Sequence, residues 1–131
     1  MSERLDVVRR VLELWRTGDD PIAEGLIADD VVYANPPDAV DAGVRHGHEG
    51  WRRAMSNFGG AFTITGIELV ALDEVGDRVL VLLDMETRGR GSGLVAIRPL
   101  GFVFDVRDGL VARLEWYNGH APAREAAQRP D

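Results

Sequence analysis

Apolar side chains recur along the chain with two different periods, helical near the amino terminus and alternating in the second half. In the first stretch they are three or four residues apart, which predicts an amphipathic helix that begins after Ser2 and ends at Gly18. Asp20 then precedes Pro21, a pairing typical of a helix start. A short second helix that continues through Ile27 is therefore expected.

A short strand and a third helix precede a long run of strands. Residues 31–35 form a mostly apolar run that two prolines end, which predicts a strand, and the third helix is expected to begin near residue 47. From Phe62 onward the apolar period is two, and turns divide the pattern into strands at about 62–73, 78–88, 94–106 and 110–118. Helices followed by hairpins predict an α+β domain, with the helices gathered on one face of an antiparallel sheet.

The turn at residues 107–109 indicates how the last two strands pair. A three-residue turn with Gly109 in the left-handed conformation would set Val106 opposite Leu110. This register gathers the large apolar side chains on one inner face. These residues are Leu100, Phe102, Phe104, Leu114 and Trp116. The outer face, which includes Val103, Val111 and Tyr117, is expected to support a two-fold dimer.

The preceding hairpin turns within the glycine-rich segment 89–93. A symmetric turn there would place Asp84 beside Arg98, with Leu80 and Leu82 continuing the inner apolar face. A charge pair enclosed by apolar residues is costly unless it has a function, which makes Asp84 and Arg98 candidate catalytic residues. An ion pair at an open rim or exposed sheet edge is the alternative.

Composition and charge exclude several classes of function. A net charge of −7 with scattered arginines argues against a nucleic-acid or anionic-membrane surface. The absence of cysteine excludes disulfides, thiol catalysis and zinc–thiolate sites. Three isolated histidines without a carboxylate at ligand spacing predict no metal site. Since no apolar run approaches membrane length and the amino terminus lacks a signal core, we expect a cytoplasmic protein.

Several motifs, taken in their order and spacing, resemble a known superfamily. They are Gly18-Asp19 after the first helix, residues 47–51 (GHEGW) at the third helix, the hairpin 88–93 and the strand 107–118. Over residues 3–125 the chain resembles the nuclear transport factor 2-like superfamily, and within it the SnoaL-like group of polyketide cyclases and ketosteroid isomerase-like proteins.

The resemblance implies a cone-shaped fold. Three N-terminal helices would pack on the concave face of a curved, mainly antiparallel β-sheet, around a pocket for a small hydrophobic, cyclic molecule. A single domain is expected over residues 1–120. Residues 121–131 would form a tail, either a short helix that covers the cone or a free segment.

Catalytic patterns of this superfamily carry over only in part. The isomerases use a tyrosine in the first helix and an acidic base after the first strand, and here these positions hold Val11 and Asn35. Limonene-type epoxide hydrolases use an Asp–Arg–Asp set, for which Asp84 and Arg98 would serve, with Asn118 in place of the second acid.

The cyclases of the group use a pocket aspartate and histidine. Asp38, His46 and His48 are available for these roles, although a histidine at a helix start is more often a capping or surface residue.

Nine residues are candidates for substrate binding. Tyr33 and Asn118 would contribute hydrogen bonds, although Asn118 could equally close the sheet, and the aromatic residues would line the pocket or form plain core. The set is Tyr33, Asn35, Trp51, Leu82, Leu100, Phe102, Leu114, Trp116 and Asn118.

Two functions remain open at this stage. The first is an enzyme or former enzyme that performs isomerisation, aldol-type cyclisation or hydrolysis without a cofactor, with Asp84 as base and Arg98 as its electrostatic partner. The second is a non-catalytic module that binds a small molecule in the pocket or a protein on the outer sheet face. A homodimer is expected in either case. Two features distinguish the functions, namely whether Asp84 and Arg98 point inward and whether a closed cavity exists.

Overall fold

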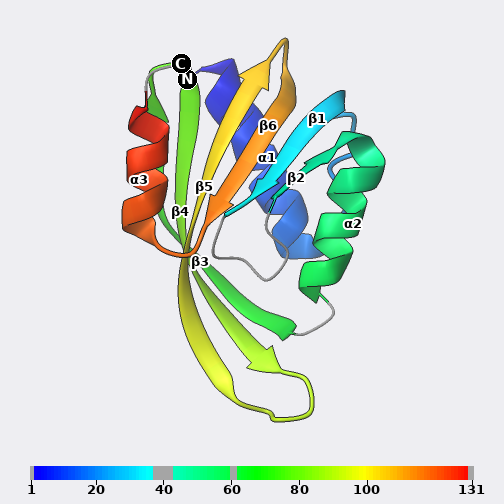
Figure 1. Ribbon diagram of the computed structural model, residues 1–131, viewed down its shortest axis with the longest axis vertical. Coiled ribbons are helices and arrows are strands. Elements are labelled where there is room, and N and C mark those ends of the chain that lie inside the picture. Colours follow the sequence, from blue (N-terminus) through cyan, green and yellow to red (C-terminus); the bar gives the residue numbers. More distant parts are fainter. Residues whose placement is uncertain (1, 37–42, 60–61, 130–131) are drawn as a thin grey trace.

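The first half of the chain forms two helices and two strands (Figure 1). The computed structural model describes residues 2–36, 43–59 and 62–129. Helix α1 spans Glu3–Thr17, where the Ser2 hydroxyl caps its start and Gly18 ends it in the left-handed conformation, as predicted. Strands β1 (Ile27–Asn35) and β2 (Gly43–His46) follow, and helix α2 spans Gly47–Gly59.

Four long strands and a third helix complete the fold. Their bounds are β3 Phe62–Val75, β4 Arg78–Gly89, β5 Val95–Arg107, β6 Leu110–Tyr117 and α3 His120–Gln128. All six strands form one sheet in the order β2-β1-β6-β5-β4-β3. β1 runs parallel to β6 and the other neighbours are antiparallel. Two register irregularities in β3 accompany the strong curvature of the sheet, since bulges increase bend and twist.

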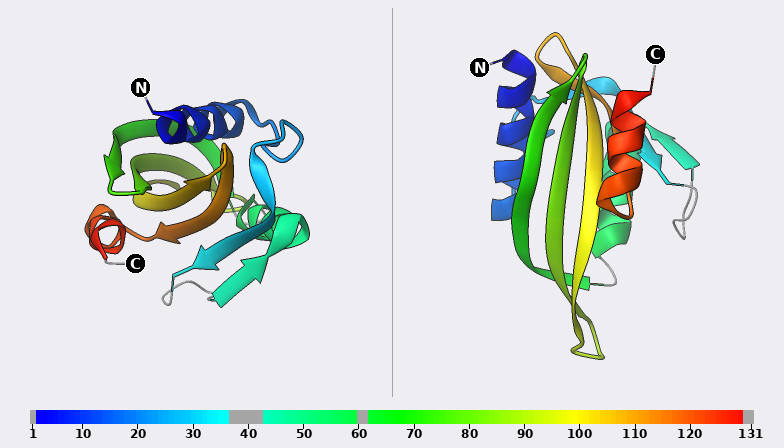
Figure 2. Two further views of the ribbon diagram at one scale, coloured as in Figure 1. Left: turned by 90° about the horizontal axis from the view of Figure 1, so that it is seen from above. Right: turned by 90° about the vertical axis from the view of Figure 1, so that its left-hand side faces the viewer.

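Helices cover both faces of the curved sheet. α1 and α2 lie on the concave side, where the core contains Val8, Val11 and Trp51. α3 lies on the convex side over Leu80 and other residues of β4 and β5, and Figure 2 shows α1 and α3 on opposite sides of the strands. The α+β class with a curved sheet is thus confirmed, although the sheet is mixed.

The segment expected to form the second helix is a turn. The Asp20 side chain accepts a hydrogen bond from the Ile22 amide at 2.9 Å, as a helix cap would. Gly25 then adopts a φ of 74°, which ends the turn after a single revolution, and β1 begins at Ile27. The third helix of the fold is therefore α3 at the carboxyl end.

The β5–β6 hairpin has a tighter turn than predicted. Asp108 and Gly109 both have positive φ, at 54° and 76°, and form a two-residue turn with Arg107 opposite Leu110. After a register shift near Val106, Phe102 lies opposite Trp116 rather than opposite Leu114. The difference from the predicted register is an even number of residues, so the large apolar side chains keep the face that the sequence pattern assigned to them.

The pairing register of the β4–β5 hairpin differs from the predicted one by a single residue. Asp84 lies opposite Pro99, and Arg98 lies opposite Met85. Because neighbouring residues of a strand point to opposite faces, this one-residue difference separates Asp84 from Arg98. It also turns Leu82 to the convex face, where it packs under α3.

Close packing and a cationic cap hold α3 on the convex face. A side chain at Gly101 would overlap the Cβ of Ala123, so the glycine allows the helix to approach the sheet. The Arg78 guanidinium donates to the carbonyl oxygens of Ala126, Ala127 and Arg129 at the end of α3. The helix buries Val103, so that part of the predicted dimer surface is covered within the monomer, and a homodimer stays a prediction.

Candidate functional site

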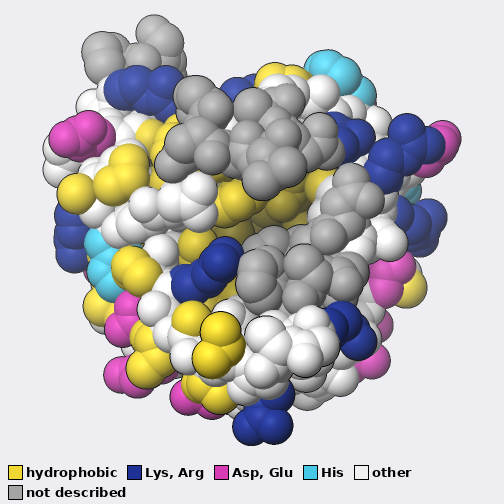
Figure 3. Space-filling view, turned by 60° about the horizontal axis from the view of Figure 1, so that its bottom comes forward, with side chains coloured by type: hydrophobic (Ala, Val, Ile, Leu, Met, Phe, Trp, Pro, Cys, Tyr) yellow, Lys and Arg dark blue, Asp and Glu magenta, His cyan; other side chains and the backbone are white. Residues whose placement is uncertain are grey.

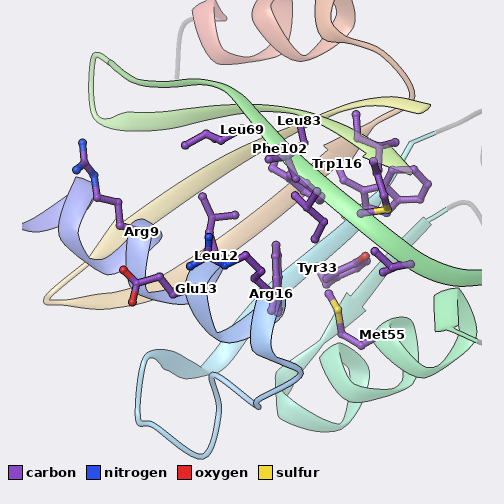
Figure 4. Close-up of a pocket in the computed structure, with 15 residues that line it drawn as sticks. Arg9, Leu12, Glu13, Arg16, Tyr33, Met55, Leu69, Leu83, Phe102 and Trp116 are labelled. Carbon is purple, nitrogen blue, oxygen red and sulfur yellow. The ribbon is translucent and has the colours of Figure 1, made fainter. Parts of the chain in front are cut away.

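A cavity of about 450 Å³ lies between α1, α2 and the concave face of the sheet (Figure 4). Its walls come from every element on that side of the fold. They are Arg9, Leu12, Glu13, Trp15, Arg16, Tyr33, Met55, Ile64, Ile67, Leu69, Leu83, Met85, Leu100, Phe102 and Trp116. Figure 3 shows apolar side chains on the floor of a hollow at one end of the molecule. The size and apolar character are those of a small-molecule site.

Aromatic rings form one continuous wall. Trp15 stacks on Trp51 at a centroid distance of 6.1 Å and lies 5.5 Å from Phe102. Tyr33 meets Trp51 edge to face at 5.7 Å. These contacts lock the rings against one another, so the wall presents flat, rigid apolar surfaces to the cavity.

Trp116 is oriented by a hydrogen bond across two parallel strands. Its indole Nε1 donates to the Asn35 side-chain oxygen at 2.6 Å. Both residues stand near the ends of their strands, β6 and β1, which are neighbours in the sheet. Asn35 therefore holds one side of the cavity wall in place.

Tyr33 is the most enclosed polar group of the cavity wall. The residue is 5% exposed, and burial raises the pKa of its phenol well above the ordinary value of 10. Its hydroxyl forms no hydrogen bond with the residues that the structure describes. A neutral phenol on the wall of an apolar cavity can donate a hydrogen bond to a molecule bound there.

The α1 side of the cavity carries charge. Arg9, Glu13 and Arg16 lie on one stripe of the helix, at spacings of four and three residues, and Figure 4 places them on the side away from Trp116. The Glu13 carboxylate is bridged to Arg10 at 3.2 Å, where both side chains are about half exposed. Within the described parts of the chain, Glu13 is the one carboxylate on the cavity wall.

Four of the nine predicted binding residues line the cavity, namely Tyr33, Leu100, Phe102 and Trp116. Two others support it from behind, since Trp51 packs against Tyr33 and Asn35 holds Trp116.

The remaining three predicted residues lie elsewhere. Leu114 is fully buried in the core, and Leu82 packs under α3 on the convex face. Asn118 is exposed just beyond the end of β6.

The predicted catalytic pair is not brought together on the concave face. Asp84 shares the convex face with Leu80, and its carboxylate lies 3.4 Å from His120 Nε2 at the start of α3. Arg98 lies opposite Met85 and is not among the described residues that line the cavity. The physical reason for the wrong predicted neighbour is that a glycine-rich turn fixes the register of its two strands poorly.

Sequence reasoning missed the contribution of α1 and β3. Leu12 and Arg16 face the cavity, and the edge strand supplies Ile64, Ile67 and Leu69. The signal for α1 was present, because Arg9, Leu12, Glu13 and Arg16 share a stripe next to the buried one. The bulges of β3 hide the corresponding signal, since they interrupt the alternation of its side chains.

The histidines at α2 do not reach the cavity wall. His48 Nε2 lies 3.0 Å from the Ile27 carbonyl oxygen, and His46 is exposed. Asp38 falls outside the described residues. Within the described ranges no group of three or more histidine and acidic side chains is placed to hold a metal ion.

None of the helices in residues 2–36, 43–59 and 62–129 is long and apolar enough to span a membrane.

Comparison with solved structures finds the same fold in several proteins. An NTF2-like protein of unknown function from Burkholderia pseudomallei K96243 is 21% identical, with a TM-score of 0.75 over 98% of this chain and 100% of that one. TerC co-crystallised with polyporic acid is 22% identical, with a TM-score of 0.73 and the same coverage. A provisionally assigned SnoaL-like polyketide cyclase from Jannaschia sp. CCS1 is 14% identical, with a TM-score of 0.75 over 98% of this chain and 94% of that one.

At these identities the structures show a shared fold alone. No curated protein matches the chain. Residues 8–114, however, match the family model of the SnoaL-like domain. Since this match covers most of the sequence and the fold agrees with it, the chain belongs to the SnoaL-like family of the nuclear transport factor 2-like superfamily.

Proposed function

We propose that the cavity binds a small, largely apolar ring compound that presents a hydrogen-bond acceptor to Tyr33. The observation that carries this proposal is the Tyr33 phenol, which is 5% exposed and has no hydrogen-bond partner among the described residues. A carbonyl or ether oxygen of a ligand would accept its proton. The aromatic rings of Trp15, Phe102 and Trp116 suit a ring compound, because stacked or edge-on aromatic contacts add to simple burial.

Binding is favoured over acid–base catalysis by the chemistry of the walls. The position where an isomerase would carry its base holds Asn35, whose amide cannot take up a proton. The convex-face position of Asp84 gives that carboxylate no part in the cavity. Glu13, the remaining candidate base, is half exposed and bridged to Arg10. We therefore place reversible binding before isomerisation, cyclisation or hydrolysis.

A matched pair of probes tests the proposal. 2-Acetylnaphthalene carries a carbonyl acceptor, and 2-ethylnaphthalene has nearly the same shape without one. Quenching of tryptophan fluorescence should report binding of both, because Trp15 and Trp116 line the cavity. The ketone should bind about three- to tenfold more tightly, as expected for one neutral hydrogen bond in a buried site.

The Tyr33→Phe variant should remove most of the preference for the ketone while the hydrocarbon affinity stays constant. Tyr117→Phe, on the convex side, is the matched control and should leave both affinities unchanged. Failure of both probes to bind, or an unchanged preference in Tyr33→Phe, would refute the proposal. Catalytic conversion is examined separately, by following the NMR spectrum of an excess of ketone over hours.

A further inference from the structure

We infer that the cavity selects ring compounds that carry a carboxylate at the end opposite their hydrogen-bond acceptor. This inference rests on the proposed function and adds the charge of the ligand to it. The observation behind it is the α1 stripe of Arg9, Glu13 and Arg16, which forms one side of the same cavity.

The two arginines of this stripe are available for a ligand. Neither Arg9 nor Arg16 forms an ion pair or hydrogen bond with the described residues, whereas Arg10 is shared by Glu13 and Glu24 at 3.2 and 2.6 Å. The Glu13 charge is thus already paired with Arg10, which does not line the cavity. Arg9 and Arg16 therefore give the α1 side of the cavity a positive charge, although the net charge of the whole chain is −7.

The separation of charged and apolar walls sets the orientation of the ligand. Figure 4 shows Arg9, Glu13 and Arg16 on α1 and Trp116 on the opposite side of the cavity, with Tyr33 beside Met55. A ligand whose ring lies against Phe102 and Trp116 would direct its other end toward α1. Arginine suits a carboxylate there, since its planar guanidinium can donate two parallel hydrogen bonds.

Arg16 is the residue expected to contact the carboxylate. Arg9 and Arg16 are seven residues apart, which is about 10 Å along a helix, so a single carboxylate contacts only one of them directly. Arg16 follows Trp15, whose ring lies 5.5 Å from Phe102 in the aromatic wall. Arg9 then acts at longer range, by attracting the anion to the opening.

The test compares 6-acetyl-2-naphthoic acid with its methyl ester, which has a similar shape and no charge. We expect the acid to bind wild-type protein about five- to tenfold more tightly than the ester, within the range for a charge-assisted hydrogen bond at a partly exposed site. Arg16→Gln should abolish this preference, so that acid and ester bind with similar affinity, and Arg9→Gln should reduce it to a smaller extent. Raising the salt concentration should weaken binding of the acid alone.

Arg124→Gln is the matched control, because Arg124 is an exposed arginine on α3, on the opposite face of the sheet. It removes the same charge and should change neither affinity. If the ester and 2-acetylnaphthalene bind but the acid binds no better, or if Arg124→Gln weakens the acid as much as Arg16→Gln does, this inference fails and the proposed function stands. If none of the three probes binds, the proposed function fails and this inference fails with it.

Discussion

The contact between Gly101 and Ala123 allows a sharp prediction about how α3 is held. A Cβ at position 101 would overlap the Ala123 Cβ and come within 3.2 Å of the Gly119 carbonyl oxygen. Overpacking of this kind costs about 1–3 kcal/mol, and alanine in extended backbone recovers roughly 0.5 kcal/mol by restricting the unfolded chain. Gly101→Ala should therefore lower the free energy of unfolding by about 1–2 kcal/mol, which lowers Tm by roughly 4–7 °C.

The second half of the experiment moves the methyl group instead of adding one. Ala123→Gly alone should also destabilise the protein, by about 1 kcal/mol, because glycine disfavours a helix. In the double variant the methyl of residue 101 would occupy the space that Ala123 vacates. Urea unfolding of the four proteins should show the double variant to be more stable than the sum of the single effects by at least about 1 kcal/mol. Strictly additive effects would refute the steric explanation.

Three further predictions concern single contacts. Burial raises the pKa of Tyr33 above 10, so the unfolded chain loses the phenol proton at a lower pH than the folded protein does. The free energy of unfolding should therefore be unaffected by this group below about pH 10 and should fall as the pH rises further. Tyr33→Phe should flatten this decline in urea titrations between about pH 9 and 11. Asn35→Ala leaves the Trp116 indole without its 2.6 Å partner and should cost about 1–2 kcal/mol of stability with a shift in tryptophan emission. Arg78→Ala removes the cap of α3, and hydrogen exchange should speed up in that helix before it does in β5; equal rates in wild type and variant would contradict this role.

The sequence predicted the order of most elements because their signals are local. Ser2 and Gly18 mark the ends of α1 where the structure has them, and the change of period at Phe62 marks the start of the hairpins. Asp20-Pro21 shows the limit of such signals, because the same cap that starts a helix also starts a single turn when Gly25 follows. Local side-chain chemistry predicts where a helix begins more reliably than it predicts how long the helix is.

The site was less predictable because it depends on register. In the β5–β6 hairpin the prediction differed by two residues, and Phe102 and Trp116 were still placed correctly in the cavity wall. In the β4–β5 hairpin a difference of one residue reversed the face of Asp84. A glycine-rich turn specifies the pairing of its strands too loosely to distinguish these cases, and only the packing of Leu82 under α3 settles it.

The parallel pairing of β1 with β6 has a consequence for synthesis on the ribosome. β1 places Tyr33 opposite Leu114, so β1 is synthesised well before the strand with which it pairs in parallel. At about 5–20 residues per second the β6-facing edge of β1 stays unpaired for several seconds, while β2 can pair with its other edge. We expect chains halted before Leu110 to expose this strand and to require a chaperone, because the wall that Trp116 and Asn35 share cannot close until β6 has been synthesised.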